Sequence, residues 1–279
     1  MASPLKIRSF LRRDRPATIE QSVLMANAPF FSIITAVLNN ASGIKKVLES
    51  IGNQSFDDLE HIVIDGGSTD ATTRILKQYE SRFQLRWISE SDNGIAEAMN
   101  KGVHMAAGIY NIFIHSDDTF VDSTVLETVA NDLVTQQYDI CSFPILFKHP
   151  RKGIIKSSPI KLPWYHRFRN TIRHQGCFVH RRVYERVGGF NHQFSIAMDY
   201  DFFYRALQNG ASIRYFDQPV ALMGGEGVSS NSSYLKKRII EEFRVQRMNE
   251  RNRIWGLAQW MFQKLYFPYK TKWCRFHSL

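Results

Sequence analysis

The chain has 279 residues, of which 44% are hydrophobic and 22% are charged; this composition is typical of a folded protein with a buried core and excludes disordered and collagen-like chains. Its three cysteines, Cys141, Cys177 and Cys274, form no CxxC pair, so we expect neither a zinc site nor a disulfide framework. The net charge is +10, yet residues 29–233 are nearly neutral and the surplus lies in residues 1–28 and 234–279, which does not fit a nucleic-acid recognition surface.

Residues 30–134 alternate between short apolar runs and amphipathic segments. The apolar runs predict strands at 30–37, 59–64, 85–88 and 110–115. The amphipathic segments predict helices through 44–51 and 75–79 and over 95–107 and 123–134. Alternation at this spacing is typical of βαβ units, so we expect an α/β fold with a mostly parallel central sheet and helices on both faces.

The second half of the chain is less regular. Residues 151–173 contain seven Lys or Arg, two prolines and no acidic residue, and we interpret them as a long, mobile basic loop. Beyond this segment, the pattern predicts a strand at 176–180 and helices at 182–187 and 198–209. A strongly basic helix is predicted over 234–253.

Polar residues directly follow three of the predicted strands. Asn39 follows the first strand, Asp65 follows the second, and Ser116, Asp117 and Asp118 follow the fourth. In open sheets of parallel strands, ligands bind beyond the carboxyl ends of the strands. We therefore expect these side chains at one rim, and this rim is the predicted ligand site.

Two of these turns have residue types suited to a nucleotide and its metal. The adjacent carboxylates of Asp117 and Asp118 are hard oxygen ligands that suit Mg²⁺ or Mn²⁺ bridging a diphosphate; a turn that caps the next helix is the alternative. The turn over residues 65–70 contains two glycines, which let a ligand approach the backbone, although an ordinary strand-to-helix turn explains it equally. Neither turn matches GxGxxG or the phosphate loop, so no dinucleotide dehydrogenase or P-loop enzyme is indicated.

Taken together, these segments resemble family 2 inverting glycosyltransferases, which have the GT-A fold. The segments that carry the resemblance, in chain order, are residues 31–39, 64–70, 92–95, 97–102, 116–118, 174–176, 189–191 and 198–202, with Arg205. The resemblance spans about residues 30–230. It is greatest with enzymes that build bacterial capsule, O-antigen or exopolysaccharide repeat units.

The resemblance implies a role for each matching residue. It implies that Asp118 is the main ligand of a Mg²⁺ or Mn²⁺ cofactor and that Asp199 is the catalytic base, supported by Asp201 and Arg205. Acceptor contacts are implied for His174 and Gln175, with a core role as the alternative. Lys101 is placed near the phosphates or as a structural partner. The residues implied in binding the donor nucleotide are Thr35, Val37, Asn39, Asp65, Gly67, Asp92, Asn93, Gly94, Lys101, Ser116 and Asp117.

The choice of base also has a physical reason. An inverting transfer needs one carboxylate to take the proton of the acceptor hydroxyl as it attacks the anomeric carbon. Asp201 is the alternative to Asp199, but Arg205 lies four residues later and can pair with it on one helix face. The chain departs from the family pattern at Ala96 and Glu97, where an aromatic residue and Asp are usual, so we expect different contacts to the donor sugar.

His115 is a further departure from the family pattern, in which Asn or Leu is usual at that position. We interpret it as a structural histidine, with an additional polar contact in the site as the alternative.

The C-terminal residues combine aromatic side chains with Lys and Arg. They are too short and too polar to span a bilayer and suit a helix lying on anionic lipid; packing on the catalytic domain or on a partner in a homodimer is the alternative.

We expect a flexible basic arm at 1–28, a glycosyltransferase domain at 29–233 with its donor half at 29–122 and its acceptor half at 123–233, and a helical segment at 234–279. With no secretory signal, a peripheral position on the cytoplasmic face of the inner membrane is expected.

The leading hypothesis is a metal-dependent inverting transferase. It would move a sugar from a UDP-sugar to a lipid-linked saccharide acceptor, with no nucleic-acid partner. A sugar nucleotidyltransferase would also use paired aspartates, but it needs a Gly-rich basic loop after the first strand, where this chain has Asn39, Asn40 and Ala41. A catalytically inactive nucleotide-sugar-binding or membrane-binding protein would lack a metal ligand or a base, and Asp118 and Asp199 are both present.

Overall fold

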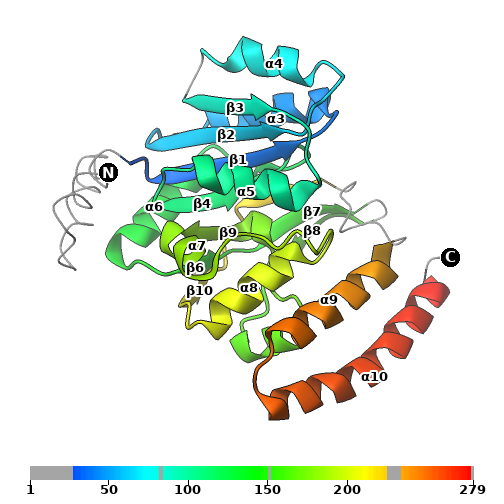
Figure 1. Cartoon of the computed structure of the whole chain (residues 1–279). Helices are drawn as coiled ribbons and strands as arrows, with labels where there is room; N and C mark the ends of the chain where they lie inside the picture. The colour runs from blue at the N-terminus through cyan, green and yellow to red at the C-terminus, as the bar shows by residue number, and fades with distance from the viewer. Residues whose placement is uncertain (1–27, 82–83, 150–151, 225–233, 278–279) are drawn as a thin grey trace.

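The computed structural model describes residues 28–81, 84–149, 152–224 and 234–277 (Figure 1). Of the predicted N-terminal arm, only residue 28 belongs to the described residues. Residues 225–233, which end at the predicted domain boundary, also lie outside them. Among the described residues, no helix combines the length and the apolar character needed to cross a bilayer.

A seven-stranded sheet runs through the centre of the described chain (Figure 1). β1 pairs in parallel with β2 and β4, and β2 pairs in parallel with β3. β10 is parallel to β6, whereas β9 runs antiparallel to β4 and β6. The predicted mostly parallel α/β sheet is therefore confirmed. In spatial order its strands are β10 (Ile213–Tyr215), β6 (Ile140–Ser142), β9 (Cys177–His180), β4 (Tyr110–Phe113), β1 (Phe31–Val37), β2 (Leu59–Asp65) and β3 (Leu85–Ser89).

Helices cover both faces of this sheet because successive side chains of a buried strand point to opposite sides. Phe31 and Ile33 of β1 join a core with α3 (Ala41–Gly52), α4 (Thr72–Tyr79) and α6 (Val125–Thr135). Ile34 joins a second core on the other face, built with α5 (Ile95–Met105), α7 (Arg181–Val187) and α8 (Met198–Gln208). The large sheet thus contains strands from both predicted halves of the domain.

A smaller, four-stranded sheet lies beside the first and was not predicted. Its order is β5 (Thr119–Phe120), β11 (Ala221–Met223), β7 (Ile145–His149) and β8 (Gly153–Ser157). The expectation of one long loop over residues 151–173 is wrong. β8 pairs antiparallel with β7, a 3₁₀ turn η1 covers Pro163–Arg167, and Thr171 and Ile172 are buried. A second 3₁₀ turn, η2 (His174–Gly176), leads into β9.

The C-terminal residues form two helices, α9 (Leu235–Asn249) and α10 (Arg253–His277). The predicted basic helix ends at Asn249 instead of continuing to residue 253, and Asn252 Oδ1 accepts a hydrogen bond from Ile254 N at 2.9 Å at the start of α10. α9 packs against α8, and α10 packs against α9. Figure 1 shows α8, α9 and α10 one after another, away from the side of the sheet that holds α3 and α4.

Candidate active site

The carboxyl ends of β1 and β2 are tied together by side chains that were predicted to bind the donor. Asn39 has a left-handed backbone (φ 49°), and its Oδ1 accepts a hydrogen bond from Thr69 N at 2.8 Å. The backbone N–H of Asn39 donates to Ser68 Oγ at 2.7 Å. Asp65 is fully buried, and its carboxylate accepts hydrogen bonds from Ser68 N at 3.0 Å and Ser89 Oγ at 2.6 Å. These contacts fix the shape of the rim.

Two of the predicted donor-binding residues lie in the sheet itself. Thr35 is fully buried, and its hydroxyl donates to the carbonyl oxygen of Ile114 at 2.6 Å and lies 2.9 Å from His61 Nε2. Val37 is 4% exposed and belongs to the hydrophobic core. The structure therefore places the side chains of Thr35 and Val37 in the core and not at the rim.

Lys101 is held by carboxylates at the start of α5. Its ammonium group lies 2.6 Å from Asp92 Oδ1, 2.8 Å from Glu90 Oε1 and 3.1 Å from Glu97 Oε1. The hydrogen bonds that Lys101 donates to these carboxylates, above all the one to Asp92, raise the pKa of Lys101. Of the two roles predicted for Lys101, the structural one matches these contacts.

The loop before α5 has an unusual backbone. Gly94 has a φ of 127°, a conformation open mainly to glycine. Glu97 accepts hydrogen bonds from Asn93 N at 3.0 Å and Asn93 Nδ2 at 2.8 Å, which lower its pKa to about 2. A small pocket adjoins this loop; it is lined by Asn93, Gly94, Ile95, Ala96, Glu97, His192, Phe194 and Ser195.

The two carboxylates that follow β4 have different surroundings. Asp117 is exposed, whereas Asp118 is 1% exposed. Asp118 accepts hydrogen bonds from the backbone N–H groups of Gly224, at 3.2 Å, and His115, at 3.3 Å. Burial, together with the negative charge of Asp117, raises the pKa of Asp118 to about 7. Ser116 lies beside them, and its carbonyl oxygen accepts from Asn40 Nδ2 at 3.2 Å.

The carboxylates of Asp117 and Asp118 are suitable ligands for a divalent cation, but two carboxylates alone do not fill its coordination shell. A buried carboxylate with a raised pKa is stabilised in its charged form by a nearby cation. Within the described residues, however, no group of three or more His, Cys, Asp or Glu is placed to hold a metal ion. Asp118 and Asp117 would therefore share a Mg²⁺ or Mn²⁺ with oxygens supplied by a bound diphosphate or by water.

Two histidines connect the β4 exit with the start of α8. The ring of His115 is buried and lies 5.2 Å from the ring of His174, edge to face. His174 Nδ1 lies 3.3 Å from Asp199 Oδ2. Burial lowers the pKa of His115 to about 3, and neither of its ring nitrogens has a hydrogen-bond partner among the described residues. Asp118, His115, His174 and Asp199 thus form a continuous line between the predicted metal ligand and the predicted base.

Asp199 is surrounded by hydrogen-bond donors. Besides His174, Asn170 Nδ2 donates to Oδ2 at 3.1 Å, and Tyr200 N donates to Oδ1 at 2.7 Å. Burial acts to raise the pKa of Asp199, but the hydrogen bond and charge of His174 and the other two donors outweigh it, so the pKa lies below its ordinary value. Asp199 is therefore ionised at neutral pH.

Asp201 and Arg205 form a structural pair. Arg205 Nε lies 2.8 Å from Asp201 Oδ2, and Asn249 of α9 donates to Oδ1 at 2.8 Å. Arg205 also donates to the carbonyl oxygens of Val187 and Gly189. Asp201 is 1% exposed, so its carboxylate is fully engaged in holding α8 to α9 and to the turn after α7.

Several residues that support the site were not predicted. Glu241 of α9 accepts hydrogen bonds from Ile196 N at 2.8 Å and Ala197 N at 3.0 Å, which satisfies free N–H groups at the start of α8. Asn170, which donates a hydrogen bond to Asp199, lies in the segment that was interpreted as a mobile loop. Gln175, a predicted acceptor residue, is 7% exposed and contacts Met223 of β11 at 3.3 Å through its amide.

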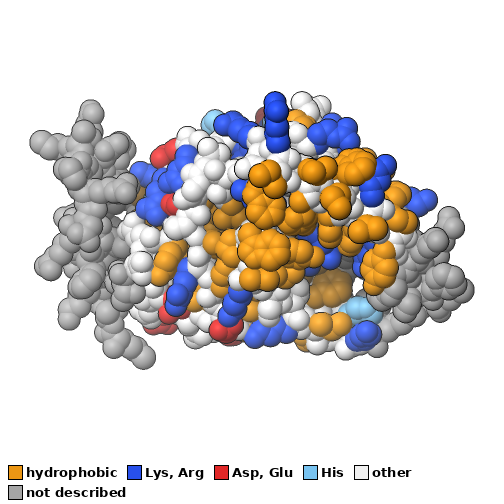
Figure 2. Space-filling view, turned by 90° about the horizontal axis from the view of Figure 1, so that it is seen from below, with side chains coloured by type: hydrophobic (Ala, Val, Ile, Leu, Met, Phe, Trp, Pro, Cys, Tyr) orange, Lys and Arg blue, Asp and Glu red, His pale blue; other side chains and the backbone are white. Residues whose placement is uncertain are grey.

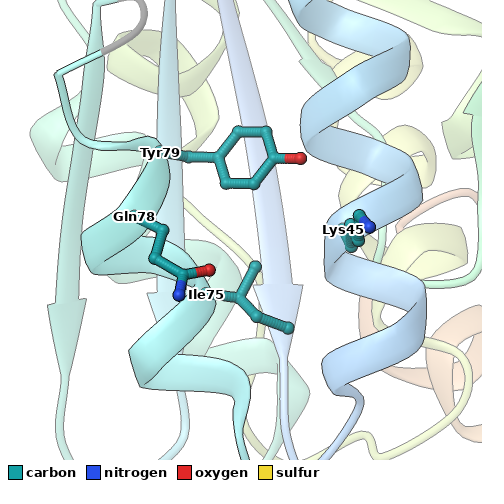
Figure 3. Close-up of a pocket in the computed structure, with 4 residues that line it drawn as sticks. All are labelled: Lys45, Ile75, Gln78 and Tyr79. Carbon is teal, nitrogen blue, oxygen red and sulfur yellow. The ribbon is translucent and has the colours of Figure 1, made fainter.

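A hollow between α3 and α4 contains none of the predicted site residues. Figure 3 shows Tyr79 of α4 pointing toward α3, with Ile75, Gln78 and Lys45 around the same space. Tyr79 donates to Glu49 of α3 at 3.1 Å. The contacts in this hollow join the two helices.

The sequence and the fold were compared with those of known proteins. Residues 32–201 match the model of glycosyl transferase family 2. A PGL/p-HBAD biosynthesis glycosyltransferase of Mycobacterium bovis is 29% identical over 219 residues, which is 74% of this chain and 80% of that protein. Chondroitin synthase of Escherichia coli is 30% identical over 194 residues, which is 68% of this chain but 28% of the synthase.

Two solved structures of glycosyltransferases have a similar fold. TarS 1–349 of S. aureus in complex with UDP-GlcNAc has a TM-score of 0.64 at 19% identity, over 78% of this chain and 66% of that one; this chain covers 39% of the longer TarS structure. The mannosyltransferase PcManGT of Pyrobaculum calidifontis, in complex with GDP-Man and Mn²⁺, has a TM-score of 0.63 at 16% identity, over 93% of this chain and 74% of that one. The chain therefore belongs to glycosyl transferase family 2 and is a glycosyltransferase with the GT-A fold.

Proposed function

We propose that this glycosyltransferase moves a sugar, with inversion and with the help of Mg²⁺ or Mn²⁺, from a UDP-sugar to a hydroxyl of a saccharide carried on a polyprenyl diphosphate. The observation that carries the proposal is the line from Asp118 through His115 and His174 to Asp199. These contacts join a carboxylate suited to a metal with an ionised carboxylate suited to proton transfer, which supports a role for both in one reaction.

The donor side of the proposal is supported by the rim. Asp117, Asp118 and Ser116 follow β4, next to the turn that Asp65 and Asn39 hold in place. A metal bound there would neutralise the negative charge that develops on the leaving diphosphate. TarS binds UDP-GlcNAc, and PcManGT binds GDP-Man with Mn²⁺, which favours a nucleotide-sugar donor here.

The acceptor side of the proposal uses Asp199 as base. The acceptor hydroxyl loses its proton to an Asp199 oxygen while its own oxygen forms the new bond to the anomeric carbon. The bond from that carbon to the diphosphate breaks on the far side, which inverts the configuration. His174 and Asn170 donate to Oδ2 and hold the carboxylate in one orientation. These bonds also lower its basicity, so proton transfer is expected late, as the hydroxyl becomes acidic.

The position at a membrane is supported by the outer face of α10. Its exposed apolar side chains are Ile254, Leu257, Trp260, Met261, Leu265 and Tyr269, and residues 253–270 contain no acidic residue. Figure 2 shows hydrophobic side chains gathered on the underside of the molecule, bordered by Lys and Arg. This combination suits an interfacial helix on anionic lipid. We propose that it docks on the cytoplasmic face of the membrane; the predicted homodimer would compete for the same face.

The acceptor class has indirect support. One relative is named for PGL/p-HBAD biosynthesis and another is a chondroitin synthase. An acceptor held at a membrane suits an enzyme with an apolar outer helix, so we place the reaction in the assembly of a cell-surface glycan such as a capsule or an O-antigen.

The proposal is tested by a donor screen. The purified protein is mixed with Mn²⁺ and each common UDP-, GDP- and dTDP-sugar, and nucleotide release and calorimetric binding are both measured. We expect one UDP-sugar to bind and to be hydrolysed slowly, with both effects lost in Asp118→Ala and with binding retained in Asp199→Asn. Absence of both binding and release for every nucleotide sugar would overturn the proposed function.

A further inference from the structure

Residues 166–174 connect the proposed base with α10. At one end, Asn170 and His174 contact Asp199. At the other end, the ring of Phe168 lies 5.4 Å from that of Phe262 of α10, and its carbonyl oxygen accepts a hydrogen bond from Gln246 of α9 at 2.8 Å. Arg169 and Arg173 lie on this short segment, between the base and the apolar face.

The guanidinium group of Arg169 is only partly satisfied. It lies 4.9 Å from the ring centroid of Tyr266 of α10, and its Nε is buried without a hydrogen-bond partner among the described residues. Two other arginines near α8 differ from it. Arg167 pairs with Glu250, and Arg205 pairs with Asp201 and two carbonyl oxygens. A buried N–H without a partner is costly, so this N–H favours a ligand that brings an acceptor oxygen.

The charges of Arg169 and of two further arginines act on the same carboxyl group, that of Glu242. Arg238 and Glu242 are four residues apart on α9 and therefore share one face of that helix. Glu242 is 9% exposed; burial raises its pKa, against the charges of Arg238, Arg169 and Arg173. Arg173 is exposed, and the charges of Asp199, Arg238, Arg169 and Glu242 all act on its guanidinium.

The charges of these three guanidinium groups thus act on one buried carboxyl group, and Arg169 and Arg173 directly precede Asn170 and His174, which contact the base. The three arginines together carry more charge than Asp199 and Glu242 do, even when both carboxyl groups are ionised. Guanidinium groups match the oxygens of phosphate in a planar, two-pronged geometry. An anion with several oxygens is therefore the ligand that this cluster fits.

We propose that Arg169, Arg173 and Arg238 form the site that binds the phosphate group of the lipid-linked acceptor. The proposal rests on the proposed function, because it needs an acceptor whose sugar reaches Asp199. A phosphate at this cluster would lie between the base and the apolar outer face of α10. The saccharide would then extend toward Asp199 and the polyprenyl chain toward the membrane.

The test measures binding of the full chain to vesicles. One set contains phosphatidylcholine with a polyprenyl diphosphate, and the other contains phosphatidylcholine with phosphatidylglycerol at the same surface charge. Inorganic pyrophosphate is added as a competitor. The variants are Arg169→Gln and Arg173→Gln, with Arg173→Lys as a conservative change. Arg214→Gln is the matched control, because this exposed arginine also lies over a tyrosine ring, 6.0 Å from the centroid of Tyr138.

We expect the wild type to prefer the polyprenyl diphosphate vesicles about tenfold or more, as charge-assisted hydrogen bonds allow. Arg169→Gln and Arg173→Gln should lose that preference, Arg173→Lys should keep part of it, Arg214→Gln should keep all of it, and pyrophosphate should compete. Equal binding to both vesicle sets by the wild type would overturn the proposal, as would a preference unchanged in both Gln variants. If the wild type binds pyrophosphate but does not prefer the polyprenyl diphosphate vesicles, the proposal that the phosphate belongs to a lipid-linked acceptor would be overturned.

Failure of this site and failure of the proposed function give different results. The donor screen uses no acceptor, so UDP-sugar binding and release report on the donor site alone. If the wild type hydrolyses a UDP-sugar but shows no preference for either vesicle set, the proposed phosphate site is overturned and the proposed transferase function stands. If the wild type binds no nucleotide sugar, the proposed function itself is overturned.

Discussion

Replacing Asp118 with Asn should make the metal-free protein more stable at pH 8 while abolishing transfer. Burial and the charge of Asp117 raise the pKa of Asp118 from an ordinary value of 3.8 to about 7. A group with a raised folded-state pKa binds its proton more tightly in the folded protein than in the unfolded chain. The free energy of unfolding therefore falls as the pH rises from about 4 to about 7, and the full penalty is present above that range.

The size of the effect follows from these two values. A difference of about three pH units corresponds to about 4 kcal/mol, which we treat as an upper bound. Asn cannot ionise, but it can accept only one of the hydrogen bonds that Gly224 N and His115 N donate to Asp118, and the lost bond costs about 1 kcal/mol. The expected net gain at pH 8 is about 1–3 kcal/mol, and it should vanish near pH 4.

Urea unfolding in the presence of EDTA, at several values between pH 4 and pH 8, measures this gain. Asp117→Asn is the control: it removes the like charge and leaves Asp118 in place, so we expect a smaller gain with the same sign. Adding Mn²⁺ and UDP should stabilise the wild type and leave Asp118→Asn unchanged. A wild-type unfolding free energy that does not change over this range, or an Asp118→Asn variant less stable than the wild type at pH 8, would refute the reasoning.

Three further changes test other parts of the site. Asp199→Asn should lower kcat by about 10²–10⁴-fold with the UDP affinity unchanged in calorimetry; an equal loss of UDP affinity would instead assign Asp199 to the donor site. Asp201→Asn leaves Arg205 without its carboxylate and should cost about 3 kcal/mol in urea unfolding, while the folded enzyme keeps its kcat. A low kcat at full stability would make Asp201 the base. Leu265→Glu, at a side chain that is 75% exposed, should weaken binding to anionic vesicles without lowering the unfolding temperature; unchanged vesicle binding would favour a protein partner for α10.

The first half of the fold was predictable because its signal is local. The buried strands β1, β2 and β4 are rich in apolar residues, and each leads into a polar turn that marks the rim. The second sheet was missed because β8 is short and mostly exposed and lies in a segment rich in Lys and Arg, which led to the interpretation of that segment as a loop. Only its pairing with β7 makes it a strand.

Residue roles were harder to predict because they depend on distant partners. Thr35 has the position expected of a pocket residue, but its hydroxyl is taken up by His61, 26 residues away, and by Ile114. Asn170 contacts Asp199 across 29 residues, and Glu241 reaches Ile196 across 45 residues. No spacing rule within one segment predicts such contacts. By contrast, the pairing of Asp201 with Arg205 was predictable, because both lie on one helix four residues apart.

The C-terminal helices were expected as a separate segment, and their contacts join them to the start of α8, which carries the proposed base Asp199. Glu241 and Asn249 of α9 hold the two ends of the Asp199–Asp201 turn, through the N–H groups before it and through the carboxylate of Asp201. Phe262 of α10 packs on Phe168, two residues from Asn170, which donates to Asp199. The outer face of α10 is therefore joined to the base through a few packed side chains. A surface that docks on α10 fixes the orientation of Asp199 relative to that surface, and this is the arrangement that transfer to a membrane-held acceptor requires.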